Sequence, residues 1–200
     1  MRCGIMGGTF DPIHFGHLFV AEEVRTRLNL DKIIFMPTGL PPHKNNSNIT
    51  QSIHRYAMAL IATGSNPYFE VSTIELDKKE ISYTIDTVKE LKKLRTGVKE
   101  FYFITGADAL LQLSTWKNIG QLINECKFIA ATRPGFEFKD MEKEIERLEK
   151  EYNTKIYEMS TTSLQISSTE IRDRVKKDCS IRYLLPEAVR NYIYKYGLYK

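Results

Sequence analysis

The sequence predicts an α/β fold in which a parallel sheet is covered by helices on both faces. Three observations lead to this expectation. Segments with strand-like and helix-like patterns alternate along the whole chain. The strand-like segments are continuous apolar runs, which is typical of parallel strands buried on both faces. Several of these runs end at glycine or proline, where a strand would stop.

The composition fits a single globular domain. The chain has 200 residues, and 42% of them are hydrophobic, which is ordinary for a protein with one sizeable core. Lys and Arg number 29 against 25 Asp and Glu, so the formal net charge is +4. This surplus suits a protein that handles small anionic molecules and is too small for a nucleic-acid-binding surface.

The cysteines and the N-terminus indicate a compartment. Cys3, Cys126 and Cys179 lie far apart and form no Cys-x-x-Cys pair, which favours a reducing environment. The N-terminal segment has no apolar run long enough for a signal peptide or a membrane span. We therefore expect a cytoplasmic protein that does not associate with membranes.

Five elements are expected in the first part of the chain. The apolar run 2–6 ends in Gly-Gly and predicts a buried strand, and residues 17–28 show a helical pattern. Residues 32–37 are rich in strand-forming side chains and stop at proline, which predicts a second strand. A loop rich in Pro, Gly and Asn follows, and we then expect a helix over 51–62 and a strand over 68–72.

Helices and strands continue to alternate in the middle of the chain. Residues 84–94 carry apolar side chains at helical spacing. The segments 100–106 and 127–135 are apolar runs that end at glycine and predict two more strands, with a helix between them around 119–126. The charged segment 139–152 has one apolar stripe, so we expect a helix whose opposite face lies in water.

The last elements complete the pattern. A strand is expected at 155–159 and helices at 168–177 and 186–196, with Pro186 in the first turn of the final helix. The sequence has no internal repeat and no linker. We therefore expect one domain over residues 1–200, with 167–200 as its small C-terminal helical part. The arrangement is that of a Rossmann-like doubly wound sheet.

Glycine, hydroxyl or cationic side chains follow nearly every predicted strand. In open parallel sheets, ligands bind beyond the carboxyl ends of the strands. The segments at that edge are GGTFDPIHFGH, PTGLPPHK, TGADALLQLSTW, TRPGF and STTSLQISSTEIR. We expect them to form one site for a polyanionic ligand.

The glycine pair Gly7–Gly8 allows two interpretations. The chain contains neither G-x-G-x-x-G nor G-x-x-x-x-G-K-[ST], so dinucleotide-cofactor and P-loop interpretations lose their strongest support. Two glycines let backbone amides approach a phosphate or an adenine closely. Taken alone, the pair favours a plain tight turn, because glycine pairs commonly mark turns. Asp11, a little further on, is expected to shape the loop through backbone hydrogen bonds.

His14 and His17 could be metal ligands, acid/base groups or donors to an anion. The His-x-x-His spacing has no third His or Cys nearby, which disfavours a metal site. Both residues flank Gly16 at an expected helix start, where the helix dipole and free amides favour an anion. The alternative is structural: His14 caps the turn and His17 packs against the helix.

The segment SSTEIR predicts a second helix start. Ser167 as N-cap with Glu170 three residues later would form a capping box. The helix would then begin with the amides of Ser168 and Thr169, and Arg172 would lie one turn further on the same side. Hydroxyl groups and an arginine at a helix N-terminus suit a phosphate. An ordinary capped helix with a surface arginine fits the same pattern.

In order along the chain, these segments resemble a known family. GGTFDPIHFGH followed by ISSTEIR resembles the nucleotidyltransferases with a His-x-Gly-His signature. With PPHK, SYTIDT, GADALLQLSTW and TRPG added, the chain is similar to bacterial nicotinate mononucleotide adenylyltransferases. The resemblance extends from Gly7 to Arg172.

The resemblance implies a reaction and a set of site residues. Such enzymes join ATP and nicotinate mononucleotide to give nicotinate adenine dinucleotide and pyrophosphate, in NAD biosynthesis. Three residues would be catalytic: His14, His17 and Arg172. Residues that would bind ATP are Gly7, Gly8, Thr9, Phe10, His14, His17, Gly106, Asp108, Ser168 and Arg172. Residues that would bind the mononucleotide are Lys44, Thr84, Asp86, Trp116 and Arg133.

This chemistry needs no general base. The attacking phosphate monoester is largely ionised at neutral pH, because its second pKa is about 6. Catalysis would then consist of positioning and of charge stabilisation. Mg²⁺ is expected to arrive with ATP, so we expect no metal site in the protein itself.

Several alternatives stay open at this stage. Trp116 would stack on the pyridine ring or pack in the core, and Asp86 would be stabilised in a first helical turn in any case. The acceptor could instead be phosphopantetheine or nicotinamide mononucleotide, and a non-catalytic nucleotide sensor would keep the same fold. The acidic run 140–151 and the lack of interleaved aromatic and basic residues argue against RNA binding. The sequence does not predict the oligomeric state.

Overall fold

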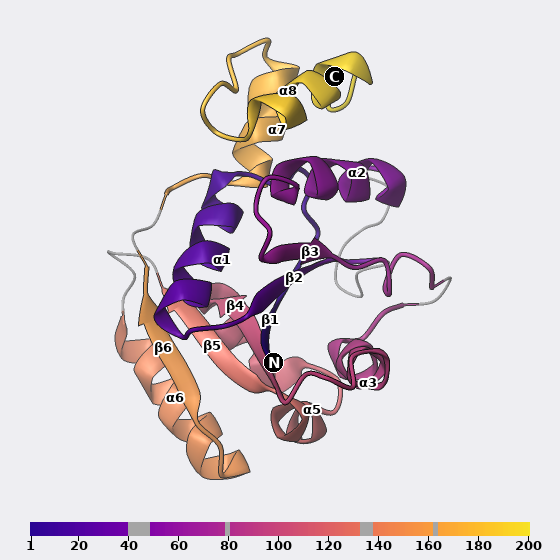
Figure 1. The fold of residues 1–200 in the computed structure, drawn as a ribbon. Coiled ribbons are helices and arrows are strands. Elements are labelled where there is room, and N and C mark those ends of the chain that lie inside the picture. Colours follow the sequence, from indigo (N-terminus) through magenta and orange to yellow (C-terminus); the bar gives the residue numbers. More distant parts are fainter. Residues whose placement is uncertain (40–48, 79–80, 133–137, 162–163) are drawn as a thin grey trace.

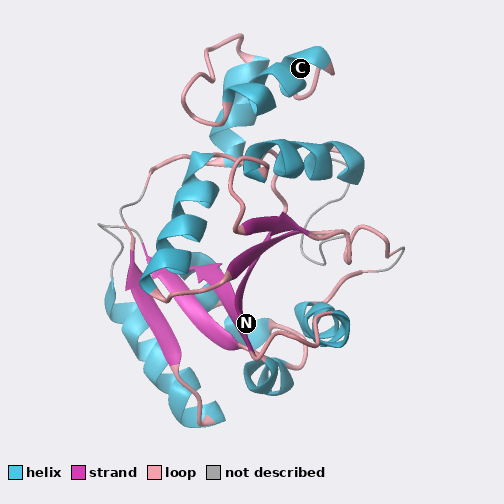
Figure 2. Ribbon diagram, viewed as in Figure 1, coloured by secondary structure: helices cyan, strands magenta, loops and turns pink. Residues whose placement is uncertain are grey.

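A computed structural model of the chain describes residues 1–39, 49–78, 81–132, 138–161 and 164–200. It contains a six-stranded, wholly parallel sheet with the strand order β3-β2-β1-β4-β5-β6 (Figures 1 and 2). The strands are β1 (Arg2–Gly8), β2 (Lys32–Pro37), β3 (Phe69–Val71), β4 (Glu100–Gly106), β5 (Lys127–Thr132) and β6 (Ile156–Ser160). The order of the strands reverses between β1 and β4, which opens a crevice at that point.

Helices cover both faces of the sheet, as predicted (Figure 1). The helices of the described residues are α1 (Phe15–Arg27), α2 (Ser52–Thr63), α3 (Thr84–Leu94), α4 (Ala107–Leu111), α5 (Ile119–Glu125), α6 (Phe138–Tyr152), α7 (Ser168–Lys176) and α8 (Glu187–Lys195), with a 3₁₀ turn at Leu113–Thr115. Helices α3, α4, α5 and α6 share one buried cluster with the sheet. Helices α1, α2, α7 and α8 share the cluster on the opposite face.

Neighbouring residues of a central strand are buried on opposite faces. Ile5 packs among α3 and α5 on one side, whereas the next residue, Met6, packs among α1 and α2 on the other. Phe103 and Ile104 of β4 divide in the same way. Because side chains alternate along a strand, a sheet with two covered faces needs apolar residues at every position. This is the reason why the strands read as continuous apolar runs in the sequence.

The C-terminal helices continue one of these cores. Val189 and Ile193 of α8 are fully buried and belong to the same cluster as Met58 and Ala59 of α2. Ile171 of α7 is also completely buried there. Figure 1 shows α8 beside α2, with α7 next to it, at the end of the molecule where α1 begins.

One helix was not predicted, and one expectation about a proline was wrong. The segment after β4 holds α4 and a 3₁₀ turn, where the sequence pattern predicts no element. Helix α4 has five residues, too few for apolar periodicity to reveal it. Pro186 is the N-cap of α8 and lies outside its first turn, because its ψ of 141° is extended. Among the described residues, no helix has the length and apolar character needed to cross a membrane.

The core makes a simple prediction about stability. Leu122 of α5 is completely buried, whereas Leu94 at the end of α3 is 64% exposed. Leu122→Ala should lower the free energy of unfolding by about 2–5 kcal/mol, because it leaves a cavity in the core. Leu94→Ala is the matched control and should change it by no more than about 0.5 kcal/mol. Urea denaturation measures both values, and equal losses would contradict the assignment of the core.

Candidate active site

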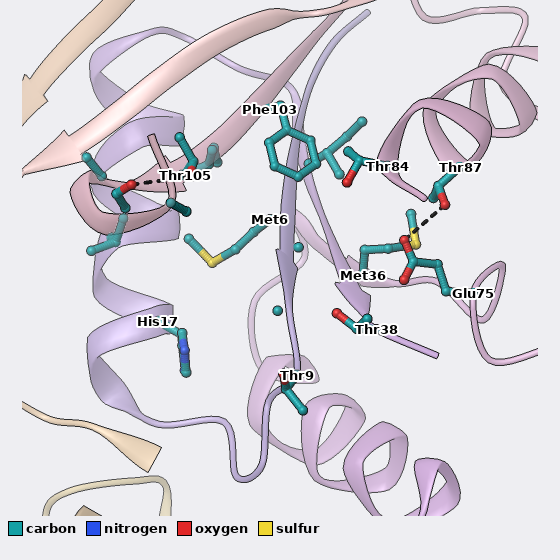
Figure 3. Close-up of a pocket in the computed structure, with 18 of the residues that line it drawn as sticks. Met6, Thr9, His17, Met36, Thr38, Glu75, Thr84, Thr87, Phe103 and Thr105 are labelled. Carbon is teal, nitrogen blue, oxygen red and sulfur yellow. Dashed lines mark hydrogen bonds between the residues drawn. The ribbon is translucent and has the colours of Figure 1, made fainter. Parts of the chain in front are cut away.

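A cavity of ≈ 860 Å³ opens at the carboxyl ends of β1 and β4 (Figure 3). It lies where the strand order reverses, the expected position for a ligand in a sheet of this kind. The ends of β1, β2 and β4 and the first turns of α1, α3 and α7 all contribute to its wall. In Figure 3, His17 on α1 and Glu75 beside α3 lie on opposite sides of β1.

Gly7 and Gly8 belong to strand β1 and do not form a turn. They pair with Met36 and Pro37 of β2. A Cβ atom at Gly7 would lie 3.2 Å from the ring of Phe103, and one at Gly8 would lie 3.0 Å from the ring of Phe10. The missing side chains therefore make room for two aromatic rings and leave the backbone of β1 open to the cavity.

Phe10 lies buried behind the cavity wall and contacts His17. Its side chain is 2% exposed and is absent from the cavity lining. Its ring meets that of His17 edge-on, with the centroids 5.1 Å apart. Phe10 therefore helps to fix the ring of His17, and its contact with ATP stays a prediction.

His14 and His17 are stacked at the start of α1. His14 is the N-cap of the helix, His17 is its third residue, and both line the cavity. Their ring centroids are 3.7 Å apart at an interplanar angle of 26°. The backbone N–H of His14 donates to Nδ1 of His17 at 3.3 Å. Since Nδ1 accepts this bond, a neutral His17 carries its proton on Nε2. The histidines can therefore cap and brace the start of α1 and also face an anion in the cavity.

Helix α7 reaches the cavity with its N-terminus. Ser167 caps the helix by accepting a hydrogen bond from the N–H of Glu170 at 3.1 Å, as predicted. The carboxylate of Glu170 accepts from Arg174 at 3.0 Å. Of the two hydrogen bonds expected for a capping box, the one accepted by Ser167 is therefore the one observed. Ser167 and Ser168 line the cavity. The hydroxyl of Ser168 donates to the carbonyl oxygen of Pro12 at 2.8 Å.

Arg172 binds the loop between β1 and α1. Its Nη1 donates to the carbonyl oxygen of Asp11 at 2.7 Å, and its Nη2 donates to the hydroxyl of Thr169 at 3.2 Å. The side chain is not part of the cavity lining. In this structure the arginine positions the loop that carries His14.

The predicted mononucleotide residues divide into two groups. Thr84 and Trp116 line the cavity, and the indole ring of Trp116 stands edge-on to Phe103 at 5.7 Å. Asp86 lies outside the lining, with its side chain 56% exposed, and its carboxylate is 3.7 Å from Nζ of Lys117. Lys117 lines the cavity and lies over the ring of Tyr83, so Asp86 reaches the site through this lysine.

The remaining predicted residues are placed as follows. Gly106, at the end of β4, lines the cavity, as does Thr9. Asp108 is exposed in the first turn of α4 and does not belong to the lining. Lys44 and Arg133 lie outside the described residues.

A buried carboxyl group that the sequence did not reveal lines the cavity. Glu75 is 7% exposed and accepts hydrogen bonds from the Thr87 hydroxyl at 2.9 Å and from the Gly39 N–H at 3.4 Å (Figure 3). Burial raises the pKa of Glu75 above its ordinary value, although both hydrogen bonds oppose this. Glu75 lies in a polar loop after β3, and no sequence pattern distinguishes it from an exposed glutamate.

Arg55 is the second residue that sequence reasoning missed. It is 2% exposed, in the first turns of α2. Its guanidinium donates to the carbonyl oxygens of Thr9 at 2.8 Å, Thr50 at 2.9 Å and Gly39 at 3.4 Å. One buried cation thus joins the segments that follow β1 and β2.

The polar groups of the cavity suit a phosphate-bearing ligand. Two imidazoles, several hydroxyls and the N-termini of α1, α3 and α7 converge on it, and these are donors for anionic oxygen. Within the described part of the chain, no group of three or more His, Cys, Asp or Glu side chains is placed to hold a metal ion.

The fold and the cavity define a nucleotide-binding protein of the doubly wound α/β class. Residues 5–174 match the model of the cytidylyltransferase-like family, and the chain belongs to this family.

Named relatives cover the whole chain. A protein of Thermoanaerobacter sp. (strain X514) is 54% identical over 100% of this chain and 95% of its own length. One of Moorella thermoacetica is 52% identical over 100% of this chain and 92% of its own. Both carry the name "Probable nicotinate-nucleotide adenylyltransferase".

Solved structures agree with the fold. The nicotinic acid mononucleotide adenylyltransferase of Plasmodium falciparum, complexed with NaAD, superposes with a TM-score of 0.80 at 25% identity. The match covers 99% of this chain and 97% of the other. The family resemblance drawn from the sequence motifs is thereby confirmed.

The burial of Glu75 predicts a pH-dependent stability difference. Its pKa is raised in the folded state, so the folded protein holds this proton more tightly than the unfolded chain does. As pH rises above the ordinary value of 4.5, ionisation therefore costs the folded state stability until the raised pKa is passed. Glu75→Gln keeps the shape of the neutral acid without this cost.

The free energy of unfolding of Glu75→Gln minus that of the wild type should accordingly grow with pH and then level off. Urea denaturation between about pH 4.5 and 8 measures the difference. Glu146→Gln is the control, because it removes a carboxylate on the exposed side of α6. A difference for Glu75→Gln that does not depend on pH would contradict a raised pKa.

Proposed function

We propose that this chain transfers the adenylyl group of ATP to nicotinate mononucleotide, giving nicotinate adenine dinucleotide and pyrophosphate. The observation that carries the proposal is the stacked pair His14–His17 at the N-terminus of α1, facing the cavity at the switch point of the sheet. The names of the full-length relatives supply the acceptor.

The reaction is an in-line displacement at phosphorus. An oxygen of the mononucleotide phosphate forms a bond to the α-phosphorus of ATP, and the bond from that phosphorus to the oxygen of the β-phosphate breaks. The nucleophile is already ionised at neutral pH. The protein therefore has to align two anions and stabilise the charge that moves onto pyrophosphate.

His17 is the residue best placed to stabilise this charge. Its Nδ1 accepts from the N–H of His14, so its Nε2 carries the proton and would donate to the ligand. The ring is fixed between His14 and the edge of Phe10. A donor held in this way costs no reorganisation when negative charge develops beside it.

ATP would lie along the exposed ends of β1 and β4. Gly7, Gly8, Thr9 and Gly106 would face its adenosine, with Asp108 at the ribose. Ser168 and Arg172 at the start of α7 would border the β- and γ-phosphates. Arginine has five N–H donors, so Arg172 retains donors for phosphate beside its bonds to Asp11 and Thr169.

The mononucleotide would take the side of the cavity next to α3. Trp116 would stack on the pyridine ring, and Thr84 would meet the ligand at the helix N-terminus, which favours an anionic group. Lys44 and Arg133 would complete this side, and Asp86 would act by holding Lys117.

Mg²⁺ would enter bound to the triphosphate. Glu75 is the one carboxylate among the described lining residues. Its raised pKa and its bonds to Thr87 and Gly39 make it a poor ligand for a hard cation. When bound, Mg²⁺ would neutralise part of the phosphate charge. We also place the enzyme in the cytoplasm, in keeping with its three free cysteines.

A direct assay tests the proposal. Purified protein is incubated with ATP, Mg²⁺ and one acceptor at a time, and the adenylylated product and pyrophosphate are measured. We expect nicotinate mononucleotide to be used with a higher kcat/KM than nicotinamide mononucleotide. Adenylylation of phosphopantetheine alone would overturn the proposal. ATP binding without release of pyrophosphate would indicate a nucleotide sensor.

The role of His17 gives a mutational prediction. His17→Ala should lower turnover by at least about 10²-fold, because the transition state loses a fixed donor. His54→Ala is the matched control, since His54 bonds to the Tyr192 hydroxyl at 3.0 Å away from the cavity lining. Steady-state kinetics and circular dichroism check activity and fold together. Near-normal turnover of folded His17→Ala would remove it from the mechanism.

The role of Trp116 gives a second mutational prediction. Trp116→Ala should weaken binding of the mononucleotide far more than binding of ATP, because stacking on the pyridine ring is lost. Trp116→Phe keeps an aromatic face and should lose less. Calorimetric titration of each ligand measures the dissociation constants. Equal losses for the two ligands would mean that the indole serves only the core around Phe103.

A further inference from the structure

The loop between β1 and α1 is held almost entirely by groups from elsewhere in the chain. The pairing of β1 with β2 ends at Gly8, and the loop then runs to His14. The sheet therefore does not fix the approach to the histidine pair. Side chains that bind the loop backbone are Arg55 at Thr9, Arg172 at Asp11 and Ser168 at Pro12.

The side chain of Asp11 also enters this network, and its farthest partner is Tyr199. Asp11 is 4% exposed. Its Oδ2 accepts from the N–H of Thr50 at 3.2 Å, and its Oδ1 accepts from the hydroxyl of Tyr199 at 2.7 Å. The two partners of this short bond are 188 positions apart in the sequence. The carboxylate thus joins the loop to the start of α2 and to the end of the C-terminal region.

The hydroxyl of Tyr199 is fixed as a donor. Burial raises the pKa of Tyr199, and so does the neighbouring negative charge of Asp11. The phenol therefore keeps its proton across the neutral range. The bond is neutral O–H to carboxylate, a short and comparatively strong type.

The backbone at Tyr199 is strained, and its surroundings hold it there. Its φ is 68°, in the left-handed region that a bulky residue rarely adopts. The preceding residue is anchored by the bond from the N–H of Leu198 to the carbonyl oxygen of Ile193, and both side chains pack against the core. Strain of this kind persists where surrounding contacts over-determine the conformation, and here it directs the ring toward Asp11.

We propose that Tyr199 is a positioning residue for adenylyl transfer: through Asp11 it fixes the loop that sets the place of His14 and His17. The inference rests on the proposed function, because it concerns the rate of that reaction. Asp11 precedes His14 by three positions, and His14 holds His17 both by stacking and by its N–H. A shift of the loop is thus passed directly to the donor at Nε2 of His17.

The expected effect is on turnover more than on binding. The hydrogen bond from His17 strengthens as charge develops in the transition state, so a small displacement of the ring is felt mainly there. The glycine backbone of β1 and the stacking surface of Trp116 do not depend on the loop. Loss of the Tyr199 hydroxyl should therefore lower kcat and leave the KM values for both substrates nearly unchanged.

Tyr199→Phe is the test, and Tyr102→Phe is its matched control. Phenylalanine keeps the ring and removes only the hydroxyl. Tyr102 is 1% exposed, and its hydroxyl donates to Glu100 at 3.0 Å and accepts from Arg2 at 2.6 Å. It lies on β4 near the amino ends of the strands, at the opposite end of the sheet from the cavity. Both variants thus lose a hydrogen-bonded tyrosine hydroxyl, but only one of these contacts the loop.

The measurements are kcat, both KM values and the thermal unfolding midpoint, on wild type and both variants. We expect kcat of Tyr199→Phe to fall by about tenfold or more, since misplacement by about 1 Å can cost 10²-fold. Tyr102→Phe should keep the wild-type kcat. Its unfolding midpoint should fall by about as much as that of Tyr199→Phe, because each variant loses one hydrogen-bonded hydroxyl.

Two results would overturn the inference. One is a wild-type kcat for Tyr199→Phe, and the other is a loss of kcat that Tyr102→Phe shares or that unfolding of Tyr199→Phe at the assay temperature explains. Failure of the proposed function looks different, because the wild-type protein itself would then form no nicotinate adenine dinucleotide.

Discussion

The geometry of the site depends on one buried cation. The guanidinium of Arg55 binds the carbonyl oxygens of Thr9, Gly39 and Thr50, and so connects the chain after β1, the chain after β2 and the start of α2. Burial lowers the pKa of Arg55, and the nearby carboxylate of Asp11 opposes this change. A charge in this position needs all its partners, because an uncompensated buried charge is very costly. Arg55 therefore fixes the segments that follow β1 and β2 relative to one another.

Apart from Glu75, the described lining of the cavity carries no acidic side chain, which suits a reaction between two anions. The attacking phosphate brings its own charge, so a base would add nothing, and a carboxylate beside it would repel both substrates. The cavity follows that logic: His17 presents Nε2–H, and burial raises the pKa of Glu75, which disfavours its charged form. Glu75 also accepts hydrogen bonds from Gly39 and Thr87, so its oxygens are engaged within the protein.

The sequence predicted the elements that carry a strong local pattern. β2, α3 and β4 have the predicted bounds, because long apolar runs or a clear helical spacing end at glycine, proline or a polar turn. Helix α4 was missed because it is little longer than one turn. The roles of Glu75 and Arg55 follow from burial by distant segments, which no local pattern reports. The ATP contacts of Phe10 and Arg172 stay predictions. Their contacts with His17 and with the carbonyl oxygen of Asp11 depend on packing between β1, α1 and α7, which no local pattern reports.

The C-terminal region supplies the contacts to the loop between β1 and α1 that the sheet does not provide. Strand pairing ends at Gly8, but Arg172 and Tyr199 bind Asp11, Ser168 binds Pro12, and Leu184 binds Phe15. Each bond joins residues more than 150 positions apart, so these contacts depend on the packing of the C-terminal region on the core. Local opening of this region would release the loop and with it the stacked histidines. The catalytic geometry is therefore only as stable as the packing of the C-terminal region against α1 and α2.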